Sequence, residues 1–267
     1  MPEPKPIAAD SWAKLRPLTA ARIGLGRAGA GIPTGETLRF KLAHAQARDA
    51  VHNTLDHEKL AAELPFSVLH LHSAAIDRIE YLQRPDLGRT LSPDSRKRLQ
   101  HLDLPASDLA IVIADGLSAL AIQRNVVSFL KHFCPLIAPH FSLAPLVIVR
   151  QGRVAIGDEI GHLLRARAVA VFIGERPGLS SPDSLGIYLT YAPRPGLTDE
   201  RRNCISNIRH AGLPHQAGAE KLAWLLHESL TRQISGINLK DEMPPTTLPL
   251  AENQPKPHLA IEASNSV

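Results

Sequence analysis

The chain has 267 residues, and 44% of them are hydrophobic but only 4% aromatic, so the core must be mainly aliphatic, as in helices packed on a sheet. The lysines and arginines behind the net charge of +4 are scattered, without the basic stripe and interleaved aromatics expected of a nucleic-acid binder. No apolar run approaches the roughly 20 residues that a membrane span needs, and the N-terminus lacks the apolar core of a secretory signal, so we expect a cytoplasmic protein.

The N-terminal part of the chain is predicted to be helical. Residues 1–9 are rich in proline and are expected to be disordered, and residues 10–64 form a helical region. Thr34 is placed to cap a long helix, and a second helical piece covers about 57–64. The apolar residues expected on or near one face of the long helix are Leu38, Phe40, Leu42, Ala45, Ala47 and Val51.

A glycine-rich segment at residues 24–29, Gly-Leu-Gly-Arg-Ala-Gly, matches the dinucleotide-binding fingerprint literally. That motif needs a buried strand before it and a helix that grows from its last glycine. Here Arg16, Pro17 and Arg22 precede it, and Pro33 and Gly35 follow it closely. The segment is therefore predicted to be a basic connecting loop.

From residue 65 to about 240, strand and helix patterns alternate, which predicts an α/β domain with a mainly parallel, Rossmann-like sheet. Residues 109–114 and 168–173 are continuous apolar runs, typical of strands buried on both faces. Further strands are expected at 67–73, 143–150 and 187–191, and an amphipathic helix at 217–234. The Pro-rich, polar residues 241–267 are predicted to be a disordered tail.

Acidic and conformationally special residues follow the two apolar strands. Asp115-Gly116 comes after the first, and Glu175-Arg176 after the second. In a parallel sheet both would open on one edge and form a rim of acidic side chains and free backbone N–H groups, suited to a polar ligand. Ser118 is expected to cap the following helix, and for Glu175 the alternative to ligand contact is a surface ion pair with Arg176.

Two other constellations carry weaker signals. His70 and His72 lie on one face of a strand and could reach a metal, but no further ligand is positioned to complete a site, which favours an edge strand with two polar residues. Cys204 and His210 could form a nucleophile pair, although cysteine is more often a small packing residue. With Cys134, the chain has only two cysteines, which fits a reducing cytoplasm. The residues thus predict no catalytic set and no metal site.

Seven short segments, in order along residues 11 to 240, together resemble the small (light) subunit of ethanolamine ammonia-lyase, an adenosylcobalamin-dependent enzyme. The segments are residues 19–29, 84–89, 114–118, 151–154, 174–178, 203–208 and 235–238. The resemblance implies a Rossmann-like domain preceded by helices, in a hetero-oligomer with a large subunit that is a TIM barrel. That large subunit holds the substrate and the radical chemistry, and the small subunit closes over the corrinoid at their interface. The complex turns ethanolamine into acetaldehyde and ammonia.

The resemblance also implies a set of cofactor contacts. The family's cobalamin-binding positions fall on Val154, Glu175 and Cys204 of this chain. Glu175 would accept hydrogen bonds from corrin amides or ribose hydroxyls, Val154 would offer apolar surface or a backbone group, and Cys204 would offer backbone groups or soft packing. The segment after Val154 departs from the family in having Ala155 and Gly157 where charged residues are usual.

Two alternatives stay open, one for the cellular location of the protein and one for its class of function. Some family members are packaged in a bacterial microcompartment through an N-terminal extension, which is short here. The alternative function is a non-catalytic α/β nucleotide-binding or assembly module that uses the same strand ends.

Overall fold

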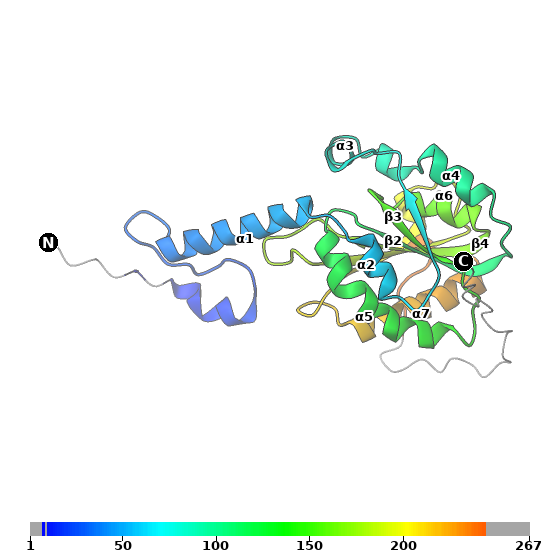
Figure 1. Ribbon diagram of the computed structural model, residues 1–267. Helices are drawn as coiled ribbons and strands as arrows, with labels where there is room; N and C mark the ends of the chain where they lie inside the picture. The colour runs from blue at the N-terminus through cyan, green and yellow to red at the C-terminus, as the bar shows by residue number, and fades with distance from the viewer. Residues whose placement is uncertain (1–6, 9, 244–267) are drawn as a thin grey trace.

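A mixed six-stranded sheet forms the body of the protein (Figure 1). The computed structural model describes residues 7–8 and 10–243; the disorder expected at 1–9 and at 241–267 falls largely outside these residues. The strands are β1 (Val68–His72), β2 (Ser107–Ala114), β3 (Leu146–Arg150), β4 (Ala166–Gly174), β5 (Leu185–Tyr191) and β6 (Arg202–Ile208).

The strands lie in the order β1-β3-β2-β4-β5-β6. The first four are parallel, and β5 and β6 extend the sheet in antiparallel fashion beyond β4. Every residue of β2 is buried, and so is nearly every residue of β4, because their continuous apolar runs occupy the middle of the sheet. The predicted α/β class with a mainly parallel sheet is confirmed.

Helices cover both faces of the sheet. The helices of the described chain, including those that do not touch the sheet, are η1 (Ser11–Leu18), α1 (Thr34–His52), α2 (His57–Ala62), α3 (Arg78–Gln83), η2 (Leu87–Arg89), α4 (Pro93–Gln100), α5 (Ala119–Ile137), α6 (Ile156–Leu163), η3 (Asp199–Arg201), α7 (His215–Arg232) and η4 (Gly236–Asn238). Helices α2, α5 and α7 pack on one face, where four leucines of α7, Leu222, Leu225, Leu226 and Leu230, are buried as the amphipathic pattern of this helix requires. Helices α4 and α6 pack on the other face. Within the described residues no helix is both long and apolar enough to cross a bilayer.

Helices η1 and α1 extend away from the sheet as an arm (Figure 1). The glycine-rich segment 24–29 connects them, with positive φ angles at Gly24, Gly26 and Gly29, so the prediction of a connecting loop is confirmed. One detail of the predicted long helix was wrong, because Pro33, not Thr34, occupies the N-cap. Leu38, Phe40 and Leu42 of this helix are exposed, since no sheet lies beneath them.

The sequence patterns did not predict β6. Its residues, Arg-Asn-Cys-Ile-Ser-Asn-Ile, are largely polar and show no regular alternation, and a register irregularity interrupts its pairing with β5. An edge strand tolerates such a sequence because one of its sides has no neighbouring strand. β1 is the opposite edge of the sheet, as the polar residues His70 and His72 suggested.

Candidate functional site

The carboxyl ends of β2 and β4 are joined through two glycines. Gly116 has a φ of +59°, and a Cβ there would lie 2.4 Å from the Gly174 carbonyl oxygen. A Cβ on Gly174 would lie 2.0 Å from the Ser118 carbonyl oxygen, and the Leu117 amide donates to Gly174 O at 2.9 Å. Only glycine allows the two loops to approach this closely. The predicted cap is confirmed, because Ser118 Oγ accepts from the Ala121 amide at the start of α5.

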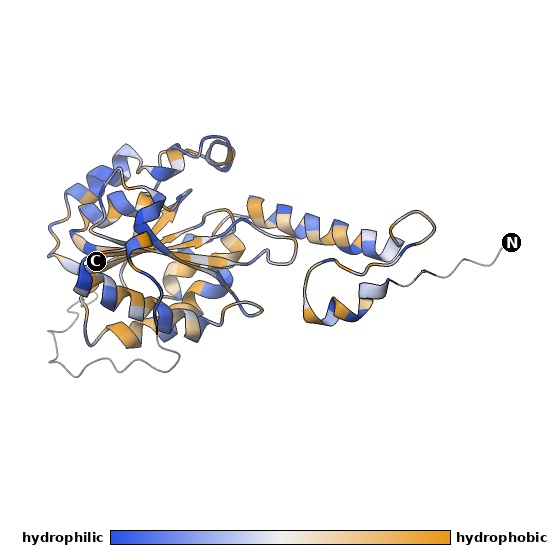
Figure 2. Ribbon diagram, turned by 180° about the vertical axis from the view of Figure 1, so that it is seen from behind, coloured by the Kyte–Doolittle hydropathy of each residue, from blue (hydrophilic) through white to orange (hydrophobic). Residues whose placement is uncertain are grey.

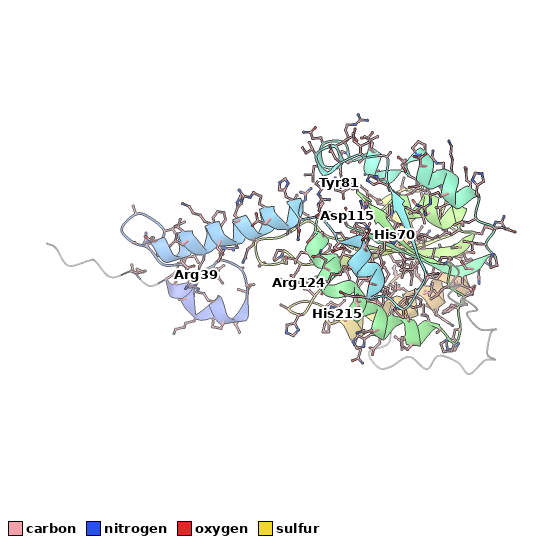
Figure 3. The ribbon with its side chains drawn as sticks, in the orientation of Figure 1. Arg39, His70, Tyr81, Asp115, Arg124 and His215 are labelled. Atoms are coloured by element: carbon pink, nitrogen blue, oxygen red, sulfur yellow. The ribbon has the colours of Figure 1, made fainter. Side chains whose placement is uncertain are left out.

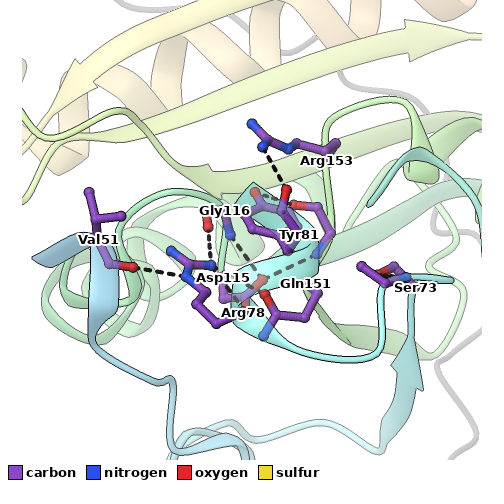
Figure 4. A network of polar contacts seen from close by, with 10 residues as sticks. Val51, Ser73, Arg78, Tyr81, Asp115, Gly116, Gln151 and Arg153 are labelled. Carbon is purple, nitrogen blue, oxygen red and sulfur yellow. Dashed lines mark hydrogen bonds and ion pairs between the residues drawn. The ribbon is translucent and has the colours of Figure 1, made fainter. Parts of the chain in front are cut away.

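Asp115 lies inside this strand end rather than on a rim (Figures 3 and 4). Its Oδ1 accepts from the amides of Gly116 at 3.0 Å and Gly152 at 3.2 Å, and Arg78 Nη1 lies 3.9 Å from Oδ2. Burial raises the pKa of the Asp115 carboxyl, while the backbone N–H groups and Arg78 act in the opposite direction. The expected rim of acidic side chains and free N–H groups is therefore wrong at Asp115, whose neighbouring amides are already used internally.

Arg78 attaches the arm to this edge of the sheet (Figure 4). Its Nε donates to the carbonyl of Val51, at the end of α1, at 2.8 Å, and its Nη1 donates to the carbonyl of Gly116 at 2.7 Å. The guanidinium groups of Arg78 and Arg153 lie 4.8 and 4.2 Å from the ring centroid of the fully buried Tyr81. These cation–π contacts and hydrogen bonds hold the end of α1 against the β2 strand end.

Glu175 follows β4 directly and is half-buried. Its Oε2 accepts from Ser184 Oγ and from the Asn207 amide at 3.3 Å. Its Oε1 faces Gly186, where an added Cβ would lie 2.9 Å away, so glycine leaves the space that this carboxylate oxygen occupies. Arg176 is exposed, and Glu175 forms no ion pair with it in the described structure, so the surface-pair alternative was wrong.

Tyr188 joins Glu175 to Cys204. Tyr188 of β5 pairs in register with Cys204 of β6, so both side chains lie on the same face of the sheet. Burial raises the pKa of Tyr188, and the neighbouring Cys204 and Glu175 raise it further. Although Cys204 is exposed, the packing around its sulfur raises the pKa of the thiol, against the effect of Tyr188. A neutral thiol is a poor nucleophile, which argues against the Cys204–His210 pair.

Val154 belongs to the same face. It lies in the loop between β3 and α6, and both it and Tyr188 pack at the margin of the core cluster under α6. Helix α6 packs mainly on β4 and β2, so the β5–β6 half of this face keeps Tyr188 and Cys204 at the surface. We refer to Val154, Glu175, Gly186, Tyr188 and Cys204 as the open sheet face. The structure thus brings the three predicted site residues to one face.

Sequence reasoning missed Tyr188 and Gly186. The signal was present in β5, where Leu185, Ile187 and Leu189 point into the α5–α7 core and leave the alternate residues for the opposite face. Without knowing that β5 pairs antiparallel with both β4 and β6, that face could not be connected with Glu175 and Cys204.

Two other features of the described surface, a hollow beside α1 and the histidines of β1, do not add to this site. A hollow of about 680 Å³ lies between the end of α1 and the start of α5. In its wall Arg124, labelled in Figure 3, forms an ion pair with Asp183 at 2.9 Å. The loop after β4 lies between this hollow and Glu175. Its residue Asp183 faces the hollow, whereas the next residue, Ser184, donates a hydrogen bond to Glu175. No group of three potential metal-ligating side chains occurs in the described residues, so His70 and His72 have no partners for a metal site.

Comparison with known proteins gives consistent matches over this whole region. The family described as "Ethanolamine ammonia-lyase light chain (EutC)" matches residues 9–240. The ethanolamine ammonia-lyase small subunit of Xanthomonas campestris pv. campestris (strain B100) is 58% identical over 241 residues, which cover 87% of this chain and 88% of the relative. The small subunit of Pseudomonas putida KT2440 is 56% identical over 244 residues, covering 89% and 90%, and that of Pseudomonas fluorescens Pf0-1 is 54% identical over 246 residues, covering 90% of each.

Proposed function

Because this chain belongs to the family of ethanolamine ammonia-lyase small subunits, we propose that it closes over adenosylcobalamin at an interface with the large subunit of that enzyme. The large subunit, a TIM barrel, holds the substrate, and the complex converts ethanolamine into acetaldehyde and ammonia. The chain contributes no catalytic residue of its own. It works in the cytoplasm, with the microcompartment as the alternative location.

The observation that supports this proposal is the open sheet face. A corrinoid presents a broad apolar ring rimmed by amide groups, so a matching wall needs apolar surface together with a few placed polar groups. Val154 and the ring of Tyr188 supply apolar surface, and Glu175 supplies a carboxylate. Oε2 of Glu175 is held by Ser184 and Asn207, so Oε1 is fixed in place next to Gly186. These residues fit the group.

Each residue then has a limited role. Glu175 Oε1 accepts a hydrogen bond from an amide or ribose hydroxyl of the cofactor. The hydrogen bonds that Ser184 and Asn207 donate to Oε2 keep the carboxylate oriented. Cys204, with its neutral thiol beside Tyr188, offers soft packing rather than nucleophilicity. When bound, adenosylcobalamin supplies the radical chemistry through its cobalt–carbon bond, while the protein supplies position and excludes water.

Co-expression tests the proposal. The chain and the large subunit of the same organism should elute together from a size-exclusion column in the presence of adenosylcobalamin and form acetaldehyde from ethanolamine. The large subunit prepared alone should be inactive or much less active. Equal activity of the large subunit with and without this chain would refute the proposed function.

A further inference from the structure

The arm exposes a set of large apolar side chains. Trp12 and Leu15 of η1 and Leu38, Phe40 and Leu42 of α1 are each between 43% and 61% exposed, and Leu18 is 80% exposed. In Figure 2, where hydrophobic residues are orange, orange segments occur along the arm, which stands away from the sheet. Scattered exposed leucines are ordinary, but several large side chains gathered on one projecting element mark an interaction surface.

The arm has almost no core of its own. Helix η1 has no buried residue, and in α1 only Ala43 and Ala50 are buried. Polar contacts hold η1 and the connecting loop to α1, namely the Arg16–Glu36 ion pair at 2.8 Å and Arg22 stacked 5.7 Å from the Phe40 ring centroid. Most of the stability of helices in proteins comes from packing an apolar face, and the arm buries almost none of its own, so this face is left for a partner.

The net charge of the protein lies on this arm. Residues 10–52 contain seven lysines and arginines and three acidic residues, a net charge of +4, and the whole chain, with 30 basic and 26 acidic residues, also has +4. The remainder is therefore neutral overall. Arg39, which is labelled in Figure 3, is exposed on α1, and so are Lys41 and Arg48 of the same helix. Two arms facing each other would bring together like charges, which disfavours a second copy of this chain as the partner.

The arm lies next to the carboxyl ends of β2 and β4, and the end of β4 carries Glu175 of the open sheet face. Arg78 bonds both the end of α1 and the strand end of β2. Arg22, in the connecting loop of the arm, donates to the carbonyl of Leu179, four residues after Glu175. A partner seated against Glu175 would therefore reach the arm across the loop that follows β4, to which Arg22 is bonded.

We propose that the arm, residues 10–52, is the principal docking surface for the large subunit, and that it binds an apolar groove with an acidic rim on that subunit. This inference rests on the proposed function, since it assigns the surface through which the proposed complex forms. The apolar side chains provide the buried anchors, and the basic residues steer the encounter.

The test is binding of the full-length chain to the large subunit, measured by surface plasmon resonance, with the double variant Leu38→Asp/Leu42→Asp. Its dissociation constant should rise at least about thirtyfold, as for loss of a central interface anchor. Ile237→Asp is the matched control, because Ile237 is 73% exposed but lies on η4, outside the arm, and it should bind like the unmodified chain. An unchanged affinity of the double variant would overturn the inference.

Two further measurements separate the outcomes. Charge reversal by Lys41→Glu/Arg48→Glu should slow association about tenfold at low salt and remove most of its salt dependence. An association rate that does not change overturns the steering role. If the unmodified chain itself does not bind the large subunit, the proposed function fails; if it binds and the arm variants bind equally well, only the docking surface is wrong. Unchanged far-ultraviolet circular dichroism shows that the arm variants remain folded.

Discussion

The two carboxylate oxygens of Glu175 have different surroundings, and this difference is the basis of the proposed cofactor contact. Oε2 is held by a hydroxyl and a backbone amide, whereas Oε1 lies over Gly186 on the open sheet face. A carboxylate fixed on one side and available on the other can accept a hydrogen bond without first losing its orientation.

Glu175→Ala should weaken cobalamin binding to the assembled complex by about 1–3 kcal/mol, because it removes a charged acceptor from a half-buried position. Titration of the complex with cobalamin, followed by its visible absorption, measures the change. Glu63→Ala is the control, since Glu63 is an exposed carboxylate at the end of α2, and it should leave the affinity unaltered. Equal affinities for all three proteins would remove Glu175 from the site.

The variant Gly186→Ala tests the position of Glu175 Oε1 by adding a methyl group next to it on β5. The new methyl group would lie 2.9 Å from Oε1 and 3.0 Å from Cγ, so the flexible Glu175 side chain must move away. We expect a loss of cobalamin affinity similar to that of Glu175→Ala but a loss of folding stability below about 1 kcal/mol, because a side-chain shift relieves the contact. Cobalamin titration measures the affinity and urea-induced unfolding measures the stability, so the two losses can be told apart. A Gly186→Ala variant with unaltered cobalamin affinity would contradict the assigned position of Oε1.

At the scale of elements, the two glycines at the ends of β2 and β4 bring the loops together. Gly174→Ala would place a methyl group 2.0 Å from the Ser118 carbonyl, a backbone atom that cannot rotate away. We expect a loss of about 3 kcal/mol in the free energy of unfolding, measured by urea titration with circular dichroism. Gly35→Ala, where a Cβ would meet nothing within 4 Å, should be neutral or slightly stabilising. Similar stabilities of the two variants would show that the strand ends are less tightly joined than described.

Sequence patterns predicted the elements whose burial is local in origin. β2 and β4 are continuous apolar runs, and α7 has a regular inward stripe, so both kinds of element could be recognised without knowledge of their neighbours. β6 could not, because its stability comes from pairing with β5 and not from its own residues. The internal position of Asp115 was not predicted for a related reason. Its carboxylate accepts a hydrogen bond from the amide of Gly152, which is distant in sequence.

The candidate site was predicted unevenly. Glu175 was predicted from its place at the carboxyl end of a buried parallel strand. The family resemblance supplied Val154 and Cys204, but no pattern in the sequence linked the three residues. Tyr188 makes that link through the register of β5 with β6. The apolar periodicity of α1 did not show what its exposed residues face, because a helix that packs on a partner subunit has the same periodicity as one that packs on its own domain.

For the whole molecule, the pH dependence of stability should reflect His57. Its side chain is 4% exposed, its Nδ1 has no partner among the described residues, and burial lowers its pKa to about 4. A lowered folded-state pKa means that stability is full above the unfolded value, near 6.5, and is lost as the pH falls towards about 4. The loss should be about 3 kcal/mol.

His57→Phe should flatten this part of the pH profile, since an apolar ring leaves no group to protonate. Urea unfolding of the full chain between pH 7 and pH 4 measures the profile, and the exposed His101→Phe serves as the control. A His57→Phe profile as steep as that of the unmodified chain would assign the acid sensitivity to other groups.

The whole account depends on one placement, that of the corrinoid against the open sheet face. The structure of the chain assembled with its large subunit and cobalamin tests it most directly. We predict that the corrin ring lies over the β5–β6 half of the sheet, in contact with Val154, Glu175 and Cys204. A corrin ring located away from the loop that follows β4 would contradict the account.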